Sequence, residues 1–306
     1  MSLNADILLD RIRLKQQMNR WRLLAIVIVV LAALFLFEKG TRYSPIKSDY
    51  IARISVEDVI SDDRDLSKLI KKVEEDSHAK AVFVWLDTPG GSAVGGQQLY
   101  LDLMHLSKVK PTVAVMRTMA TSAGYMAALG TDHLVAREGS ITGSIGVIME
   151  AFEATELAKK LGVNPITVKS GPYKASPNPF EKYTPEQNAV IQAIIDDFFD
   201  WFVDIVAERR GLPHDTVKKL ADGRIYTGRQ ALKAKLIDEL GGEDEAREWL
   251  KKTKRIDSSL DIEDVKIEKE TPGLFDQLSQ LANGKIGAHL LQKLDGLQAI
   301  WQPNSL

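Results

Sequence analysis

The sequence has no cysteine among its 306 residues, which excludes disulfide bonds, cysteine nucleophiles, Cys-ligated zinc and iron–sulfur clusters. Histidine is scarce too: there are five, and no HExxH or similar metal-ligand spacing occurs. Forty Lys and Arg residues nearly balance forty-two Asp and Glu residues, so no basic excess favours a nucleic-acid partner. The composition, 44% hydrophobic, is that of a folded protein. Any covalent catalysis must therefore use Ser, Thr or Lys.

Long apolar runs are equally rare, but one lies near the N-terminus. Residues 23–37 read LLAIVIVVLAALFLF, and residues 1–22 before them are rich in Arg and Lys. The run is shorter than the roughly 20 residues of a bilayer span, although Trp21 and Lys39 extend it toward the interfaces. We interpret residues 23–37 as a single-pass signal-anchor in the inner (cytoplasmic) membrane, with residues 1–22 in the cytoplasm. The alternatives are a buried core helix and a cleaved signal peptide.

The rest of the chain divides by composition into three segments. Residues 38–49 form a polar linker after the anchor. Residues 50–242 alternate β-branched runs with amphipathic stretches, which is typical of one α/β domain. We expect this domain on the non-cytoplasmic (periplasmic or extracellular) side of the membrane. Residues 243–306 form a C-terminal extension of unknown role, in which 274–301 has the pattern of one or two amphipathic helices.

The hydrophobic pattern also predicts individual elements. Strands are expected at 50–56, 81–86, 112–116, 133–136 and 166–169, with another near Val147. Helices are expected at 66–75, 96–106 and 155–161, with another beginning near Ser122. A long helix should begin at Pro185 with Thr184 as its N-cap, and Gly211 should end it.

Four loops that follow predicted strands are rich in small residues. They cover 87–92 (DTPGGS), 119–125 (MATSAGY), 139–147 (GSITGSIGV) and 169–180 (KSGPYKASPNPF). Consecutive glycines such as Gly90 and Gly91 can direct backbone amides at a developing oxyanion, although each loop taken alone fits an ordinary turn. Phosphate binding is disfavoured because neither a Walker lysine nor a GxGxxG spacing is present.

Ser122 stands at a predicted strand-to-helix junction, where unpaired amides and the helix dipole stabilise negative charge. It is either a nucleophile or only a helix N-cap, and its surroundings do not match the G-x-S-x-G elbow of α/β-hydrolases. Among the histidines only His133 lies near a motif, in a segment that reads as a strand. The fourth loop offers the lysines Lys169 and Lys174 instead.

Together these segments resemble the signal peptide peptidase A family. The resemblance runs from about Tyr50 to Gly242 and rests on five motifs in order. These are PGG at 89–91, SAGY at 122–125, TGSIGV at 142–147, SGPYK at 170–174 and ADGRIYTGRQALKAKLIDELGG at 221–242. Five ordered motifs are far more specific than any one of them. The family implies a ClpP/crotonase-like fold of stacked ββα units and a serine endopeptidase that needs no cofactor and no metal.

Carried over position by position, the resemblance makes Ser122 the nucleophile and Lys174 the general base. The amides of Gly91 and Ala123 become the oxyanion hole; Ala123 replaces a glycine common in the family, which matters little because only its amide is used. A lysine with an ordinary pKa of about 10.4 is protonated at neutral pH, so burial must lower that pKa. Hydroxyls can then orient the neutral amine, and Ser144 and Ser170 are the candidates by motif.

The resemblance also implies partners. Substrates would be remnant signal peptides or similar apolar peptides, and the family assembles as homo-oligomeric rings whose serine and lysine can come from neighbouring protomers. Two alternatives stay open: a crotonase-type acyl-CoA enzyme, and a catalytically inactive crotonase-like membrane scaffold. The presence of both Ser122 and Lys174, together with the anchor, argues against the acyl-CoA enzyme.

Overall fold

The computed structural model describes residues 14–15, 17–26, 29 and 48–266. The chain separates into two compact units, Met1–Ser48 and Asp49–Leu306. In the first unit, residues 17–26 are helical and their side chains are exposed. No helix within the described ranges is long and apolar enough to cross a membrane. Of the predicted anchor at 23–37, residues 27–28 and 30–37 lie outside those ranges.

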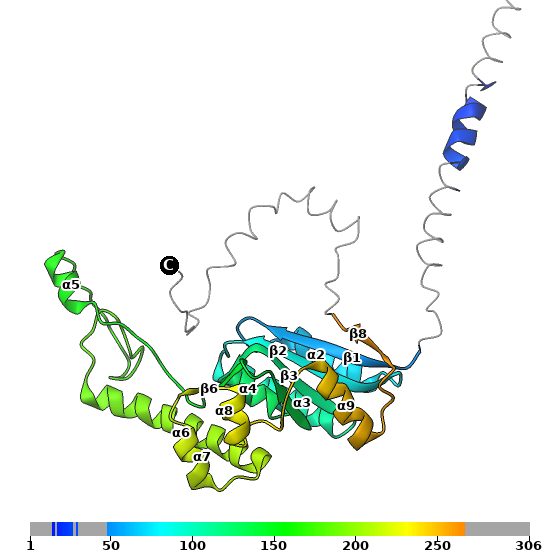
Figure 1. Cartoon of the computed structure of the whole chain (residues 1–306). Helices are drawn as coiled ribbons and strands as arrows, with labels where there is room; N and C mark the ends of the chain where they lie inside the picture. Colours follow the sequence, from blue (N-terminus) through cyan, green and yellow to red (C-terminus); the bar gives the residue numbers. More distant parts are fainter. Residues whose placement is uncertain (1–13, 16, 27–28, 30–47, 267–306) are drawn as a thin grey trace, which may run out of the picture. The chain divides into compact units, whose positions relative to one another are not determined.

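The second unit is built on one eight-stranded sheet (Figure 1). The strands are β1 (Tyr50–Glu57), β2 (Ala79–Thr88), β3 (Thr112–Thr121), β4 (His133–Ala136), β5 (Ile141–Gly143), β6 (Ile225–Thr227), β7 (Glu239–Leu240) and β8 (Asp261–Asp264). Their order is β6-β5-β3-β2-β1-β8, and β4 pairs with β3 and β7. Every pair is parallel except β5–β6. The carboxyl ends of β2, β3 and β5 therefore meet at one edge of the sheet.

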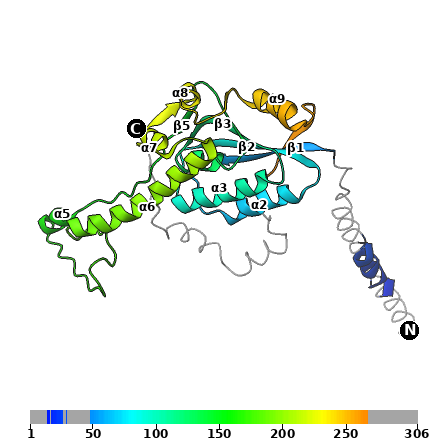
Figure 2. The ribbon, with the colours of Figure 1, turned by 90° about the horizontal axis from the view of Figure 1, so that it is seen from below.

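Helices cover both faces of the sheet. They are α2 (Arg64–Glu75), α3 (Ala93–Ser107), α4 (Ala123–Ala128), α5 (Thr155–Lys160), α6 (Pro185–Arg210), α7 (His214–Leu220), α8 (Gly228–Lys233) and α9 (Glu243–Lys254). In Figure 2, α2 and α3 lie on one side of the sheet and α9 on the other. This arrangement confirms the α/β class expected from the alternating sequence pattern.

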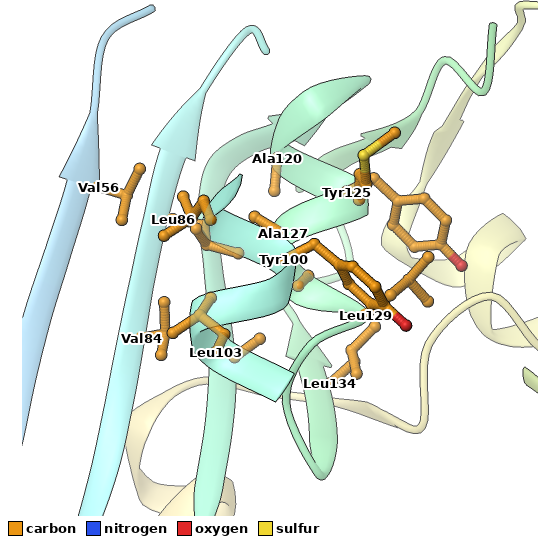
Figure 3. Packing of buried hydrophobic residues seen from close by; sticks show 14 of the residues in the cluster. Val56, Val84, Leu86, Tyr100, Leu103, Ala120, Tyr125, Ala127, Leu129 and Leu134 are labelled. Carbon is orange, nitrogen blue, oxygen red and sulfur yellow. The ribbon is translucent and has the colours of Figure 1, made fainter. Parts of the chain in front are cut away.

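The central strands are apolar at successive positions because each of their faces meets a different core. Val84 and Leu86 of β2 point toward α3 and α4, where they pack with Leu103 and Ala127 (Figure 3). The alternate residue Phe83 joins the opposite core, to which α9 contributes Ala246 and Leu250. Burial on both faces thus explains the continuous AVFVWL run, which no half-exposed strand would need.

Helix α6 begins and ends where the sequence predicts. Thr184 accepts a hydrogen bond from the amide of Gln187 in a capping box, Pro185 is the first helical residue, and Gly211 closes the helix at φ 60°. Its buried residues, Phe202, Val203, Ile205 and Val206, all lie in the C-terminal half. The N-terminal half has none, because it projects from the sheet together with α5 (Figures 1 and 2). We call residues 148–200 the arm.

The arm leaves many apolar side chains exposed. They are Ile148, Met149, Phe152, Leu157, Leu161, Val163, Ile166, Val168, Tyr173, Phe180, Tyr183, Val190 and Ile194. Ile166 and Val168 are 92% and 94% exposed, and the strands predicted at 166–169 and near Val147 do not form. A segment with no neighbouring strand cannot pair its backbone groups, so β-branched residues alone do not make it a strand.

Residues beyond Gly242 also join this unit. Helix α9 packs Ala246 and Leu250 on the sheet, and β8 pairs in parallel with the first half of β1. Arg53 of β1 forms ion pairs with Glu243 and Asp264 and stacks over Trp85 with 4.2 Å between its Cζ atom and the ring centroid. Residues 243–264, which the sequence places in a C-terminal extension, are therefore part of the sheet and its covering layer.

Candidate active site

Ser122 lies between the end of β3 and the first residue of α4. Its backbone has φ 53° and ψ −119°, a left-handed conformation that is uncommon outside glycine. Its amide donates to the carbonyl of Gly143 at 2.8 Å, while its side chain makes no capping hydrogen bond and is half-buried. The hydroxyl is therefore not used as an N-cap. Strained backbone of this kind concentrates at functional sites, where surrounding structure must hold it in place.

The turn after β2 lies directly against Ser122. Gly90 adopts φ 107°, and a Cβ atom placed on it would be 2.9 Å from Ser122 Cβ and 3.2 Å from the Ala123 nitrogen. A Cβ on Gly91 would stand only 1.9 Å from the carbonyl oxygen of Ile60. Both positions need glycine because backbone approaches backbone there.

Two amides at this junction point to no acceptor. Among the described residues, the amides of Gly91 and Ala123 donate to no protein group, whereas the Gly90 amide donates to Thr88 Oγ1 at 3.1 Å. Ala123 opens α4, whose first amides lack partners within the helix. The structure thus brings Ser122, Ala123 and the Gly90–Gly91 turn to one sheet edge, and the two segments that meet there carry two unpaired backbone amides, the kind of donor that an oxyanion hole uses.

Ser144 joins this group from β5. Ser144 has φ 51°, and Gly143 before it has φ 82°. Strand β5 pairs with the end of β3, so that Gly143 lies opposite Thr121. Ser144 donates its amide to the carbonyl of Arg224 at 2.9 Å and is half-buried. Three neighbouring strand ends therefore break at left-handed residues around Ser122, and Ser144 is near it within the same chain.

Tyr125 fastens helix α4 to the chain segment around Leu236. This side chain is fully buried, and its hydroxyl donates to the carbonyl of Leu236 at 2.8 Å. Burial raises the pKa of the Tyr125 phenol far above its usual value, so the group remains a neutral donor. The contact fixes the helix that presents Ala123.

Lys174 and Ser170 are placed elsewhere. Both are exposed on the loop between α5 and α6, which lies on the arm away from the sheet in both views (Figures 1 and 2). The Lys174 amide donates to the Gly171 carbonyl at 3.2 Å, and within the described residues its side chain has no ion pair or hydrogen bond. A single chain therefore brings neither Lys174 nor Ser170 to Ser122.

The other lysine of this loop is already engaged. Lys169 forms a short ion pair with Glu181, and both side chains are largely buried. The Lys169 hydrogen bond lowers the pKa of Glu181, against partial desolvation and with help from Thr167. The amine of Lys169 is therefore already held by a carboxylate within the arm, whereas Lys174 has no such partner among the described residues.

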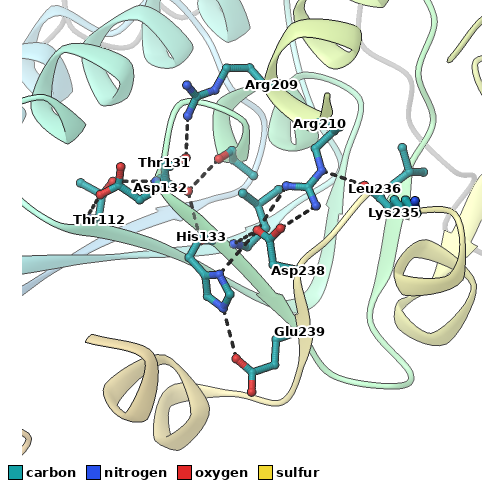
Figure 4. Close-up of polar contacts among 12 residues, drawn as sticks. Thr112, Thr131, Asp132, His133, Arg209, Arg210, Lys235, Leu236, Asp238 and Glu239 are labelled. Atoms are coloured by element: carbon teal, nitrogen blue, oxygen red, sulfur yellow. Dashed lines mark hydrogen bonds and ion pairs between the residues drawn. The ribbon is translucent and has the colours of Figure 1, made fainter. Parts of the chain in front are cut away.

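His133, the histidine nearest a motif, belongs to a network at the opposite edge of the sheet (Figure 4). Its ring nitrogens lie 3.1 Å from Glu239 and 3.7 Å from Asp238, and it stacks on Trp249 at 4.6 Å between centroids. Arg210 also holds Asp238, at 2.7 Å. His133 pairs with Val113 of β3, so Ser122 lies nine residues further along, or roughly 30 Å at strand spacing. This histidine is structural.

Metal ligands do not gather around Ser122. Within the described ranges, no group of three or more His, Asp or Glu side chains is placed to hold an ion.

Comparisons with known proteins find peptidases among the relatives of this chain. The family model described as peptidase family S49 matches residues 104–257. A candidate protease of Synechocystis sp. is 41% identical over 201 residues, which cover 65% of this chain and 72% of the relative. A candidate protease of Methanocaldococcus jannaschii is 35% identical over 232 residues, covering 76% and 74%.

A third relative, the chloroplastic serine protease SPPA of Arabidopsis thaliana, is 30% identical over 223 residues, which cover 72% of this chain but 33% of that protein. A candidate signal peptide peptidase of Enterococcus faecium is 36% identical over 195 residues, covering 63% and 57%. The region matched by the family model includes Ser122, Lys174 and the ends of β3 and β5, and it begins after the Gly90–Gly91 turn. The chain belongs to peptidase family S49, the signal peptide peptidase A family that its motifs predict.

Proposed function

We propose that this chain is a membrane-anchored serine endopeptidase with a Ser122–Lys174 dyad on a ClpP/crotonase-like fold. The observation that carries the proposal is the strained, uncapped Ser122 with the unpaired amides of Gly91 and Ala123 beside it. Family membership supports peptide hydrolysis over the acyl-CoA chemistry that a similar oxyanion hole also serves.

The reaction would pass through an acyl-enzyme. The Ser122 hydroxyl oxygen bonds to the scissile carbonyl carbon while its proton passes to the amine of Lys174. The Gly91 and Ala123 amides stabilise the resulting oxyanion. The C–N bond then breaks, and the leaving amine takes the proton from Lys174. Water then attacks the ester carbon while it loses a proton to Lys174. The C–O bond to Ser122 breaks, Lys174 returns that proton to the Ser122 oxygen, and the carboxylic acid product leaves.

The separation of Lys174 from Ser122 in one chain supports a site shared between copies. We propose a homo-oligomeric ring in which the arm of one protomer carries Lys174 to the Ser122 of its neighbour. The exposed apolar residues of the arm, Ile166 and Val168 among them, would be buried in that contact. Their burial would also remove water from the lysine, which lowers the pKa of an amine.

Substrate and location are the finer parts of the proposal. Remnant signal peptides or similar apolar peptides fit relatives that carry the name signal peptide peptidase. The run at 23–37 with its basic flank supports a single-pass inner-membrane protein whose residues 50–242 lie outside the cytoplasm.

A mixing experiment tests the shared dyad. Ser122→Ala removes the nucleophile and Lys174→Ala removes the base. Each variant should lose both hydrolysis of an apolar peptide and labelling by a serine-reactive phosphonate. Co-assembled in equal amounts, the two variants should regain about a quarter of wild-type activity, because one in four random neighbour pairs places an intact Ser122 against an intact Lys174. Activity of Ser122→Ala near that of the wild type would refute the nucleophile. Absence of any regain would refute the shared site and leave the dyad within one chain.

A further inference from the structure

Thr88, the last residue of β2, is completely buried between the two turns of the candidate site. Its hydroxyl accepts a hydrogen bond from the Gly90 amide at 3.1 Å and donates to the carbonyl of Asp58. The Gly90 carbonyl is 3.3 Å away, but a hydroxyl has one proton to give and Asp58 is the nearer acceptor. The hydroxyl therefore fastens the glycine turn to the chain segment that follows β1.

The same segment holds the other side of the turn. Ile60 donates its amide to the Gly90 carbonyl at 2.8 Å, and Ser92 donates to the Ile60 carbonyl at 2.9 Å. The groups before and after Gly91 are thus used, and its own amide is left free. The direction of that amide depends on contacts that converge on Thr88 and the 58–60 segment.

The second branch of Thr88 reaches the nucleophile's helix. A Cβ placed on Gly124 would lie 2.6 Å from Thr88 Cγ2 and 3.5 Å from the Thr88 carbonyl oxygen. The methyl group therefore lies close against the backbone of the first turn of α4, one residue after Ala123. Gly124 allows this approach because it has no side chain of its own.

We propose that Thr88 is a positioning residue that sets the spacing of the two oxyanion donors. Its hydroxyl branch holds the turn that presents the Gly91 amide, and its methyl branch supports the helix turn that presents the Ala123 amide. Oxyanion donors act only when they lie about 2.7–3.1 Å from the developing charge, so a small displacement of either turn weakens transition-state binding. The inference rests on the proposed function.

Thr88→Val tests the hydroxyl branch because it keeps the side-chain shape. We expect kcat to fall about 10- to 100-fold, short of the 10²- to 10³-fold typical of deleting a donor outright, while KM changes little. Thr88→Ser restores the hydroxyl and should recover most of kcat. The matched control is Thr112→Val: Thr112 is equally buried, and its hydroxyl accepts from the Asp132 amide at 3.0 Å at the far end of β3. This control should lower Tm without lowering kcat.

A second readout separates positioning from stability. A peptide aldehyde forms a hemiacetal with Ser122 whose oxygen occupies the oxyanion hole, so its Ki should rise in Thr88→Val by the factor that kcat/KM falls. The Kd of an unreactive peptide, measured with Ser122→Ala in the background, should stay constant.

Three outcomes overturn the inference. One is wild-type kcat/KM and aldehyde Ki in Thr88→Val while Ser122→Ala is inactive; the proposed function then stands. If Thr88→Val does not fold, Thr88→Ala, which also removes the hydroxyl, takes its place. It overturns the inference if it lowers Tm as the Thr112→Val control does while kcat/KM and the aldehyde Ki stay at their wild-type values. Full activity of Ser122→Ala removes the proposed function and the inference together, and this pattern is distinguishable from the other two.

Discussion

Ser122 stands on a turn whose neighbours are buried or tightly bonded, whereas Lys174 stands on an exposed loop of the arm. The first region combines three strand ends, two glycines that admit no side chain and a helix anchored by Tyr125. The second region exposes apolar residues over most of its length. Two functional residues of one proposed dyad thus have opposite surroundings.

The difference shows which part of the site one chain can preorganise. Oxyanion donors depend on backbone geometry, and the sheet edge fixes that geometry locally. A lysine becomes a base at neutral pH only where burial lowers its pKa, and the isolated arm gives Lys174 no burial. In the proposed dyad, the nucleophile half would therefore be complete within a protomer, and the base half would depend on what covers the arm.

We expect the largest effect from separate substitutions of the two lysines of the arm. Lys174→Arg keeps the charge but cannot supply a neutral amine, so the rate of peptide hydrolysis should fall about 10²- to 10⁴-fold. Lys169→Arg keeps the ion pair with Glu181 and should retain most activity. Initial rates at saturating peptide measure both. An active Lys174→Arg beside an inactive Lys169→Arg would transfer the role of base to Lys169.

The two halves of α6 offer the next largest contrast. Phe202→Ala opens a cavity in the core and should cost about 3–5 kcal/mol of unfolding free energy. Ile194→Ala, on the exposed half of the same helix, should stay within about 0.5 kcal/mol. Urea unfolding of both variants at high dilution measures the difference. An equal loss at Ile194 in dilute protein would mean that the arm packs within its own chain.

Lowering the pH should produce the smallest effect, and it tests whether the Lys169–Glu181 ion pair holds the loop of the arm. The ion pair with Lys169 lowers the pKa of Glu181. The stabilisation that this pair gives the folded arm is therefore complete above the unfolded-state pKa of about 4.3, and it is lost as pH falls through the lower pKa of the folded state. Hydrogen-exchange protection of residues 170–180, corrected for intrinsic rates, should decrease between pH 5 and pH 3. Glu181→Gln should show low protection at every pH. Protection that is independent of both pH and Glu181 would show that other contacts hold the loop.

Much of the sheet could be predicted because its residues carry local signals. The β-branched runs of β1, β2 and β3 are buried on both faces, and the Thr184–Pro185 start and Gly211 end of α6 are caps that act within a few residues. The small residues around Ser122 indicated a tight junction for the same reason. These features depend on neighbours in sequence.

Other parts depend on contacts between distant segments. Strand β6 (IYT) has only three residues and β8 (DIED) is strongly acidic, so their pairing with β5 and β1 is what makes them strands. The run at 166–169 has the opposite property, a strand-like sequence without a partner. Thr88 was part of a recognised motif, but its importance lies in contacts with Asp58 and Gly124, which sequence spacing does not reveal. The motif predicts a role for Lys174, whereas its distance from Ser122 depends on the tertiary structure.

The charge of β8 restricts how copies of this protein can meet. Its sequence, DIED, places Asp261, Glu263 and Asp264 along the outer border of the sheet. A second molecule that docked strand to strand there would set carboxylates against carboxylates, which like-charge repulsion disfavours. The other edge strands, β6 and β7, offer only three and two residues for pairing. Fibril-like growth through these edges is thereby discouraged, and copies of the chain can associate through the exposed apolar residues of the arm without pairing their sheets.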